Sequence, residues 1–175
     1  AILLQTGNSA SGSTGGVSVS TGASVAAASG SIVLQNQDAT TSIGGSIDIS
    51  AGSSTQQNGG FVHIASGASD TSASGSVDIL TSASPSSGAV EIQSGSSNAG
   101  LSGDLNVKTG TAVGGASGAV LVATGASNSA VGANIAIKSG NSVSQQGGSV
   151  TLTSGSSVNG VGGRMEIKSA SVGSG

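Results

Sequence analysis

The sequence of 175 residues predicts an all-β fold, a β-solenoid built like a parallel β-helix with 15-residue coils and about twelve rungs. Three observations support this fold class. Pairs of aliphatic residues recur through the whole chain, small residues stand at fixed offsets from them, and the composition excludes a deep core of large side chains. A fold that repeats one short unit accounts for all three.

The aliphatic pairs, in which one residue separates two aliphatic ones, set the period. They are Ile2/Leu4, Val17/Val19, Ile32/Leu34, Ile47/Ile49, Val62/Ile64, Val77/Ile79, Val90/Ile92, Leu105/Val107, Val120/Val122, Ile135/Ile137, Val150/Leu152 and Met165/Ile167. Successive pairs begin 15 residues apart, except that Val77 and Val90 are 13 apart. Alternating apolar and polar positions are typical of a strand with one buried face. We therefore predict a strand at each pair and contact between the pairs of successive coils, so that Val17, Ile32 and Ile47 touch.

Small residues occupy fixed positions between the pairs. Counted from the first residue of each pair, position 5 is mostly Ser or Thr, position 6 is usually Gly and position 8 is usually Ser. A glycine also stands two residues before most pairs, as at Gly45 and Gly148. These glycines predict turns that need either a positive φ or a close approach of two backbone segments. In the shortened coil, the two missing residues fall near Pro85, in a segment expected to form an outward loop.

The composition restricts how such a chain can bury surface. Charged residues make up 6% and aromatic residues 1%, and there are 32 glycines and no cysteine. No disulfide or thiolate metal site is therefore available, and only a thin core of small side chains is possible. A disordered Gly/Ser-rich linker is the alternative interpretation. The constant register of the aliphatic pairs favours the ordered repeat.

Charge and motifs exclude several function classes. A net charge of -3 with four basic residues argues against a nucleic-acid partner. No apolar run approaches the roughly 20 residues needed for membrane insertion. The glycines follow neither a phosphate-binding nor a dinucleotide-binding pattern, and the few carboxylates cannot build serial calcium sites. We therefore assign no catalytic, cofactor-binding or metal-ligating residue and expect neither an enzyme nor a cofactor.

The only histidine has acidic neighbours in the predicted coils. Asp48, His63 and Asp78 share position 2 on consecutive coils, and Glu91 follows. Such a set could suggest acid–base catalysis or a metal site. Because these positions lie on a convex strand face without a predicted pocket, we favour a histidine that merely separates two carboxylates.

Other charges are unevenly placed along the chain. Lys108, Lys138 and Lys168 share position 4, which predicts a solvated face, with binding to an anionic surface as the alternative. Residues 1–103 carry five carboxylates and no Lys or Arg, a charge of -5. Residues 104–175 carry two carboxylates and four cations, a charge of +2.

We interpret residues 1–175 as a single uncapped solenoid domain, a segment of a longer protein or a filament subunit. Bare solenoid ends expose strand edges that can pair with another chain. Together with the opposite charges of the two ends, they predict end-to-end self-association into a filament.

The repeat resembles, in architecture only, the Gly/Ser/Thr-rich parallel β-solenoids of extracellular fibres and adhesins. This resemblance implies a structural protein that forms a stiff extracellular or cell-surface fibre, with a cell-surface or extracellular-matrix partner. The coil length and the Ser/Thr column also resemble insect-type antifreeze solenoids, which makes ice binding the alternative function. Solenoid enzymes that process polysaccharides are similar in coil stacking, but they use clustered Asp and Arg, and Arg164 is the only arginine here.

Overall fold

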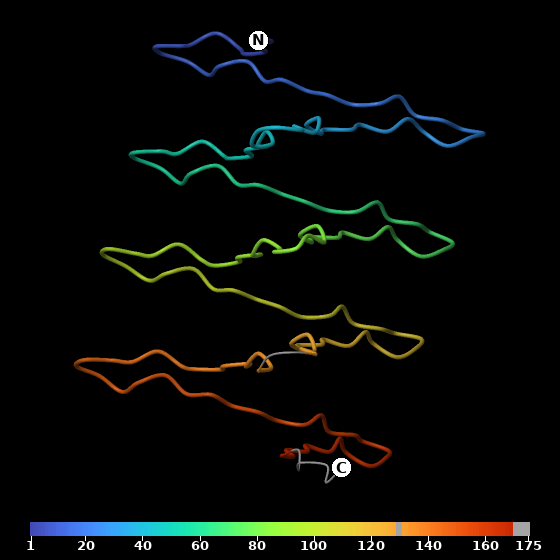
Figure 1. Ribbon diagram of the computed structural model, residues 1–175, viewed down its shortest axis with the longest axis vertical. Coiled ribbons are helices and arrows are strands. Elements are labelled where there is room, and N and C mark those ends of the chain that lie inside the picture. The colour runs from blue at the N-terminus through green and yellow to red at the C-terminus, as the bar shows by residue number, and fades with distance from the viewer. Residues whose placement is uncertain (129–130, 170–175) are drawn as a thin grey trace. The chain divides into compact units, whose positions relative to one another are not determined.

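The computed structural model describes residues 1–128 and 131–169, and within them it contains neither a helix nor a strand. Figure 1 accordingly shows a coil without strand arrows. The predicted all-β fold, with its 15-residue β-solenoid coils and the shortened coil near Pro85, is therefore wrong. No likeness to the β-solenoids of fibres and adhesins remains.

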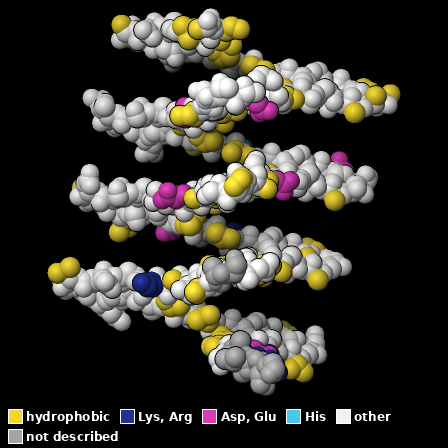
Figure 2. All heavy atoms as spheres, viewed as in Figure 1, with side chains coloured by type: hydrophobic (Ala, Val, Ile, Leu, Met, Phe, Trp, Pro, Cys, Tyr) yellow, Lys and Arg dark blue, Asp and Glu magenta, His cyan; other side chains and the backbone are white. Residues whose placement is uncertain are grey.

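The aliphatic pairs do not form the predicted core. Val17, Ile32 and Ile47 are 54%, 58% and 47% exposed, and none of the described residues is buried. Figure 2 shows hydrophobic atoms at the surface along the chain. The pairs therefore form no buried apolar core in the described part of the chain.

The backbone hydrogen bonds of the described chain stay within single repeats and do not join one repeat to the next. In the described residues they join Gly60 N–H to Gly52 O, Gly75 to Gly67, Gly148 to Gly140 and Gly163 to Gly155, at 2.8 to 3.0 Å. Each lies within one repeat, so no ladder links one repeat to the next. Ordering a residue costs about 1–2 kcal/mol of conformational entropy, and Gly, Ser and Ala bury too little apolar surface to offset it.

In seven repeats of the described chain, a hydrogen bond instead joins the two arms of a loop at the loop's base. The carbonyl at position 6 accepts the N–H of the glycine two residues before the next pair, as in Gly52 and Gly60. In three other repeats the position-5 side chain closes the base: Thr21 Oγ1 donates to Gly30 O at 3.2 Å, Thr124 Oγ1 to Ala133 O at 3.3 Å, and Asn36 Nδ2 to Ser46 O at 2.9 Å. The trace in Figure 1 doubles back at such loops.

Close approach across the loop base accounts for the glycine that precedes some of the pairs. A Cβ added to Gly45 would lie 3.1 Å from the Asn36 side chain, and one added to Gly148 would lie 3.2 Å from Ser139 Cβ. No described glycine has a positive φ. Of the two reasons that the sequence offered for these glycines, close approach is the one that applies.

The serine at position 8 fixes the tip of the loop. In six repeats its Oγ accepts the backbone N–H three residues later, at 2.9 to 3.1 Å; the serines are Ser9, Ser24, Ser54, Ser69, Ser97 and Ser142. This is a local bond of the kind with which serine competes against regular secondary structure. The serine column is thus explained by turn formation inside one repeat.

We expect Gly148→Ala to weaken the base of its loop. The new Cβ would lie 3.2 Å from Ser139 Cβ, which is closer than an ordinary contact, so the two arms must move apart slightly. Losing a hydrogen bond worth about 1 kcal/mol should speed exchange of the residue-148 amide about fivefold beyond its intrinsic rate. Hydrogen exchange followed by NMR measures this.

Gly147→Ala is the matched control, because its Cβ would meet Gly140 O at an ordinary 3.6 Å. This variant should leave the exchange of the residue-148 amide unchanged. Equal effects of the two substitutions would contradict the close-approach explanation.

The chain divides into two units, Ala1–Val90 and Glu91–Gly175, with the boundary inside the pair Val90/Ile92. Each unit contains loops of the same kind among its described residues. No helix in the described residues is long and apolar enough to cross a membrane.

Candidate functional site

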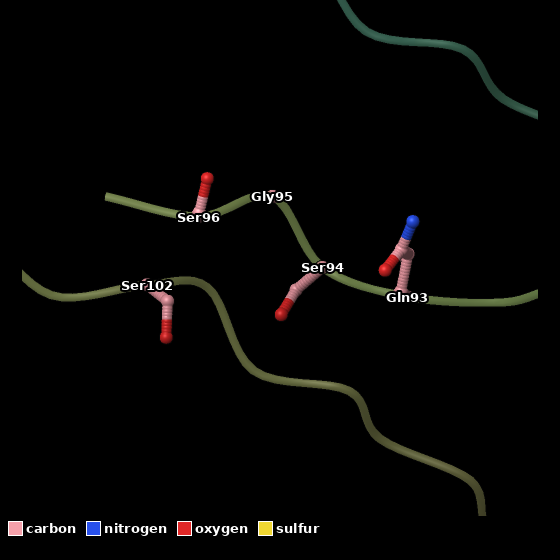
Figure 3. Close-up of a pocket in the computed structure, with 5 residues that line it drawn as sticks. All are labelled: Gln93, Ser94, Gly95, Ser96 and Ser102. Carbon is pink, nitrogen blue, oxygen red and sulfur yellow. The ribbon is translucent and has the colours of Figure 1, made fainter. Parts of the chain in front are cut away.

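One hollow in the described chain lies between the two arms of the loop that follows the pair Val90/Ile92. It is lined by Gln93, Ser94, Gly95, Ser96 and Ser102. Figure 3 shows that Ser94 points toward the other arm, whereas Gln93 and Ser96 point to the opposite side. The hydroxyls do not converge, and no histidine or carboxylate lines the hollow to activate one. The hollow offers neutral hydrogen-bonding groups and no arrangement for nucleophilic catalysis.

A second hollow shows where a loop base brings apolar side chains together. Leu152 and Met165 line it together with Thr151, Thr153, Ser154 and Arg164. Leu152 is the second residue of one pair and Met165 is the first residue of the next. The loop therefore brings neighbouring pairs toward each other at its base, but both residues stay about half exposed or more, at 64% and 48%.

The position-2 set does not assemble into a site. Within the described ranges, no group of three or more His, Cys, Asp and Glu side chains could hold a metal ion. Asp78 Oδ2 accepts a hydrogen bond from Ser76 Oγ at 3.2 Å, a partner only two residues away. The predicted arrangement of Asp48, His63 and Asp78 depended on stacked coils, which the described structure lacks.

A charged cluster that sequence reasoning did not identify lies near the C-terminal end of the described residues. Glu166 forms ion pairs with both Arg164 and Lys168. Residues two apart in an extended chain point to the same side, so the spacing itself was the available signal. The Arg164 and Lys168 side chains are 76% and 77% exposed, and pairs of this kind contribute little to stability.

The feature that recurs in every repeat is therefore the exposed aliphatic pair, not a pocket or a polar cluster. Large exposed apolar surface is typical of sites that contact another molecule. This makes the aliphatic pairs the candidate functional surface. Comparisons of the chain with protein-family models, with curated proteins and with solved structures found no match.

Proposed function

We propose that this chain is a structural repeat protein whose copies associate with one another through the aliphatic pairs, outside the cell or at its surface. The observation that carries the proposal is the exposure of the pairs throughout the described residues. Fully burying one Val, Leu or Ile side chain contributes about 1.5–3 kcal/mol, so even partial burial at several repeats favours association. A repeated weak contact also suits a structural role, because its strength adds up along the chain.

The charges of the two units favour contact between copies. Ala1–Val90 has four carboxylates and no Lys or Arg, which gives -4. Glu91–Gly175 has three carboxylates and four cations, which gives +1. Opposite charges guide the first unit of one copy toward the second unit of another and disfavour contact between two first units.

The contact differs from the one that the sequence predicts. End-to-end association needed exposed strand edges, and the described residues contain no strand. We therefore place self-association on the aliphatic pairs. The extracellular or cell-surface location, and a matrix or cell-surface partner, are supported by the Gly, Ser and Thr content of the repeats, which suits a structural material more than an enzyme.

Sedimentation velocity of the complete chain at increasing protein concentration tests the proposal. We expect the mean mass to rise with concentration, and added salt to weaken the association partly, because salt screens the charges but leaves the apolar contact. A monomer at every concentration, in low and in high salt, would contradict the proposal.

Ice binding, the alternative function, has no specific observation in its favour. The Thr21 and Thr124 hydroxyls of the position-5 column donate to backbone carbonyls in their own loops. No strand in the described residues arranges the column on a flat face. A thermal-hysteresis measurement decides the question, and we expect no hysteresis.

A further inference from the structure

We propose that Asn58 and Asn159 are sites of spontaneous covalent modification, at which the asparagine closes onto the backbone nitrogen of the following glycine and becomes aspartate or isoaspartate. Of the nine asparagines in the chain, only these two precede glycine. Both are exposed and lie in the loops of their repeats, outside any helix or strand. The inference does not depend on the proposed function.

The reaction needs only the chain and water. The Gly59 nitrogen loses its proton and attacks Asn58 Cγ, so that an N–C bond forms and the bond from Cγ to the side-chain amide nitrogen breaks. That nitrogen leaves as ammonia, taking up the proton, and a five-membered succinimide ring remains. Water then opens the ring at one of its two carbonyl carbons, which yields aspartate or the β-linked isoaspartate. Asn159 and Gly160 react in the same way.

The backbone at both sites is free to reach the geometry of attack. In the described part of the chain, neither Gly59 N–H nor Gly160 N–H donates a hydrogen bond, whereas the neighbouring Gly60 N–H is held by Gly52 O at 2.8 Å. In six other repeats the position-8 serine Oγ accepts the backbone N–H three residues later. Ser157 and Gly160 occupy the same two positions, but this hydrogen bond is not formed between them. Glycine adds freedom of its own, because it has no Cβ to hinder rotation or approach.

Two other asparagines are internal comparators. Asn106 precedes Val107 and Asn134 precedes Ile135, both β-branched residues whose side chains crowd the attacking nitrogen. Both asparagines are exposed like Asn58 and Asn159, so exposure alone cannot separate the two groups. Complete conversion at Asn58 and Asn159 adds two carboxylates to the net charge of -3 and makes it -5.

The test is incubation of the complete chain at mildly alkaline pH, followed by peptide mapping with mass spectrometry and isoelectric focusing. We expect Asn58 and Asn159 to convert at least about tenfold faster than Asn106 and Asn134, because only the first two precede a residue without a Cβ. Two acidic bands should appear in sequence. Equal rates at the four asparagines would overturn the proposal.

The variant Gly59→Ala hinders the attacking nitrogen at Asn58 while leaving the loop able to form. The added Cβ would meet Gly52 O at 3.4 Å, an ordinary contact, and Gly59 has no positive φ, so the loop can accept alanine. Conversion at Asn58 should fall about tenfold while conversion at Asn159 stays unchanged, because only the first attack is hindered. Unchanged conversion at Asn58 in this variant would also overturn the proposal.

Discussion

Heating a dilute solution of this chain should produce no cooperative unfolding transition, by either calorimetry or far-UV circular dichroism. Cooperative melting requires a buried core, and no described residue is buried. A folded domain of this length would absorb about 120 kcal/mol at its midpoint, at about 0.7 kcal/mol per residue. We expect a shallow, continuous change instead, and a circular dichroism spectrum of coil before heating.

The coil structure also predicts how fast the backbone amides of single residues exchange with solvent. Most amides should exchange near their intrinsic rates, and those of Gly60, Gly75, Gly148 and Gly163 should be the slower ones, because they donate the backbone hydrogen bonds at the loop bases. A sigmoidal loss of a β-sheet spectrum, or strong protection at the aliphatic pairs of the dilute, unassociated chain, would contradict the coil structure.

Replacing valines in the aliphatic pairs by serine should weaken self-association about a thousandfold, if each of four substitutions removes about 1 kcal/mol of apolar burial between copies. The substituted residues are Val17, Val19, Val120 and Val122. Sedimentation equilibrium of the full chain measures the dissociation constant. The reason for the loss is specific: these residues belong to the repeated surface that we assign to the contact.

The matched control replaces four valines that lie outside the pairs, so that both variants lose the same side chains. These valines are Val25, Val113, Val143 and Val158, all almost fully exposed. This variant should associate nearly as well as the unaltered chain. Equal weakening in the two variants would show that general hydrophobicity, and not the aliphatic pairs, drives association.

Only part of the repeat's local structure could be predicted from its residues, because the strands expected at the aliphatic pairs are absent from the described residues. Gly45 and Gly148 recur at one offset because two arms of the chain meet there, and close approach was one of the two reasons expected for such glycines. Ser54 and Ser142 share a position because the Oγ of each serine accepts the backbone N–H three residues later and so stabilises a turn. Bonds of this kind join residues only a few positions apart, so a fixed spacing in the sequence is enough to specify them.

The candidate site was less predictable. The exposed pairs are the residues that the sequence assigned to the core, and the Glu166 ion pairs with Arg164 and Lys168 were not expected. Periodicity shows that Val17 and Ile32 occupy equivalent places, but equivalence does not require contact. Asp48 and His63 likewise share a position without forming a site.

The amino-acid sequence alone determined the length of the repeat, the positions of the glycines between the pairs and the placement of the aliphatic pairs. Only the tertiary structure decided whether successive repeats stack, and in the described residues they do not. Stacking would need burial between repeats to exceed the entropy lost by ordering each residue, and that balance depends on the surface actually covered. With serine, alanine and glycine at most positions, the chain retains its local loops and leaves its aliphatic residues exposed.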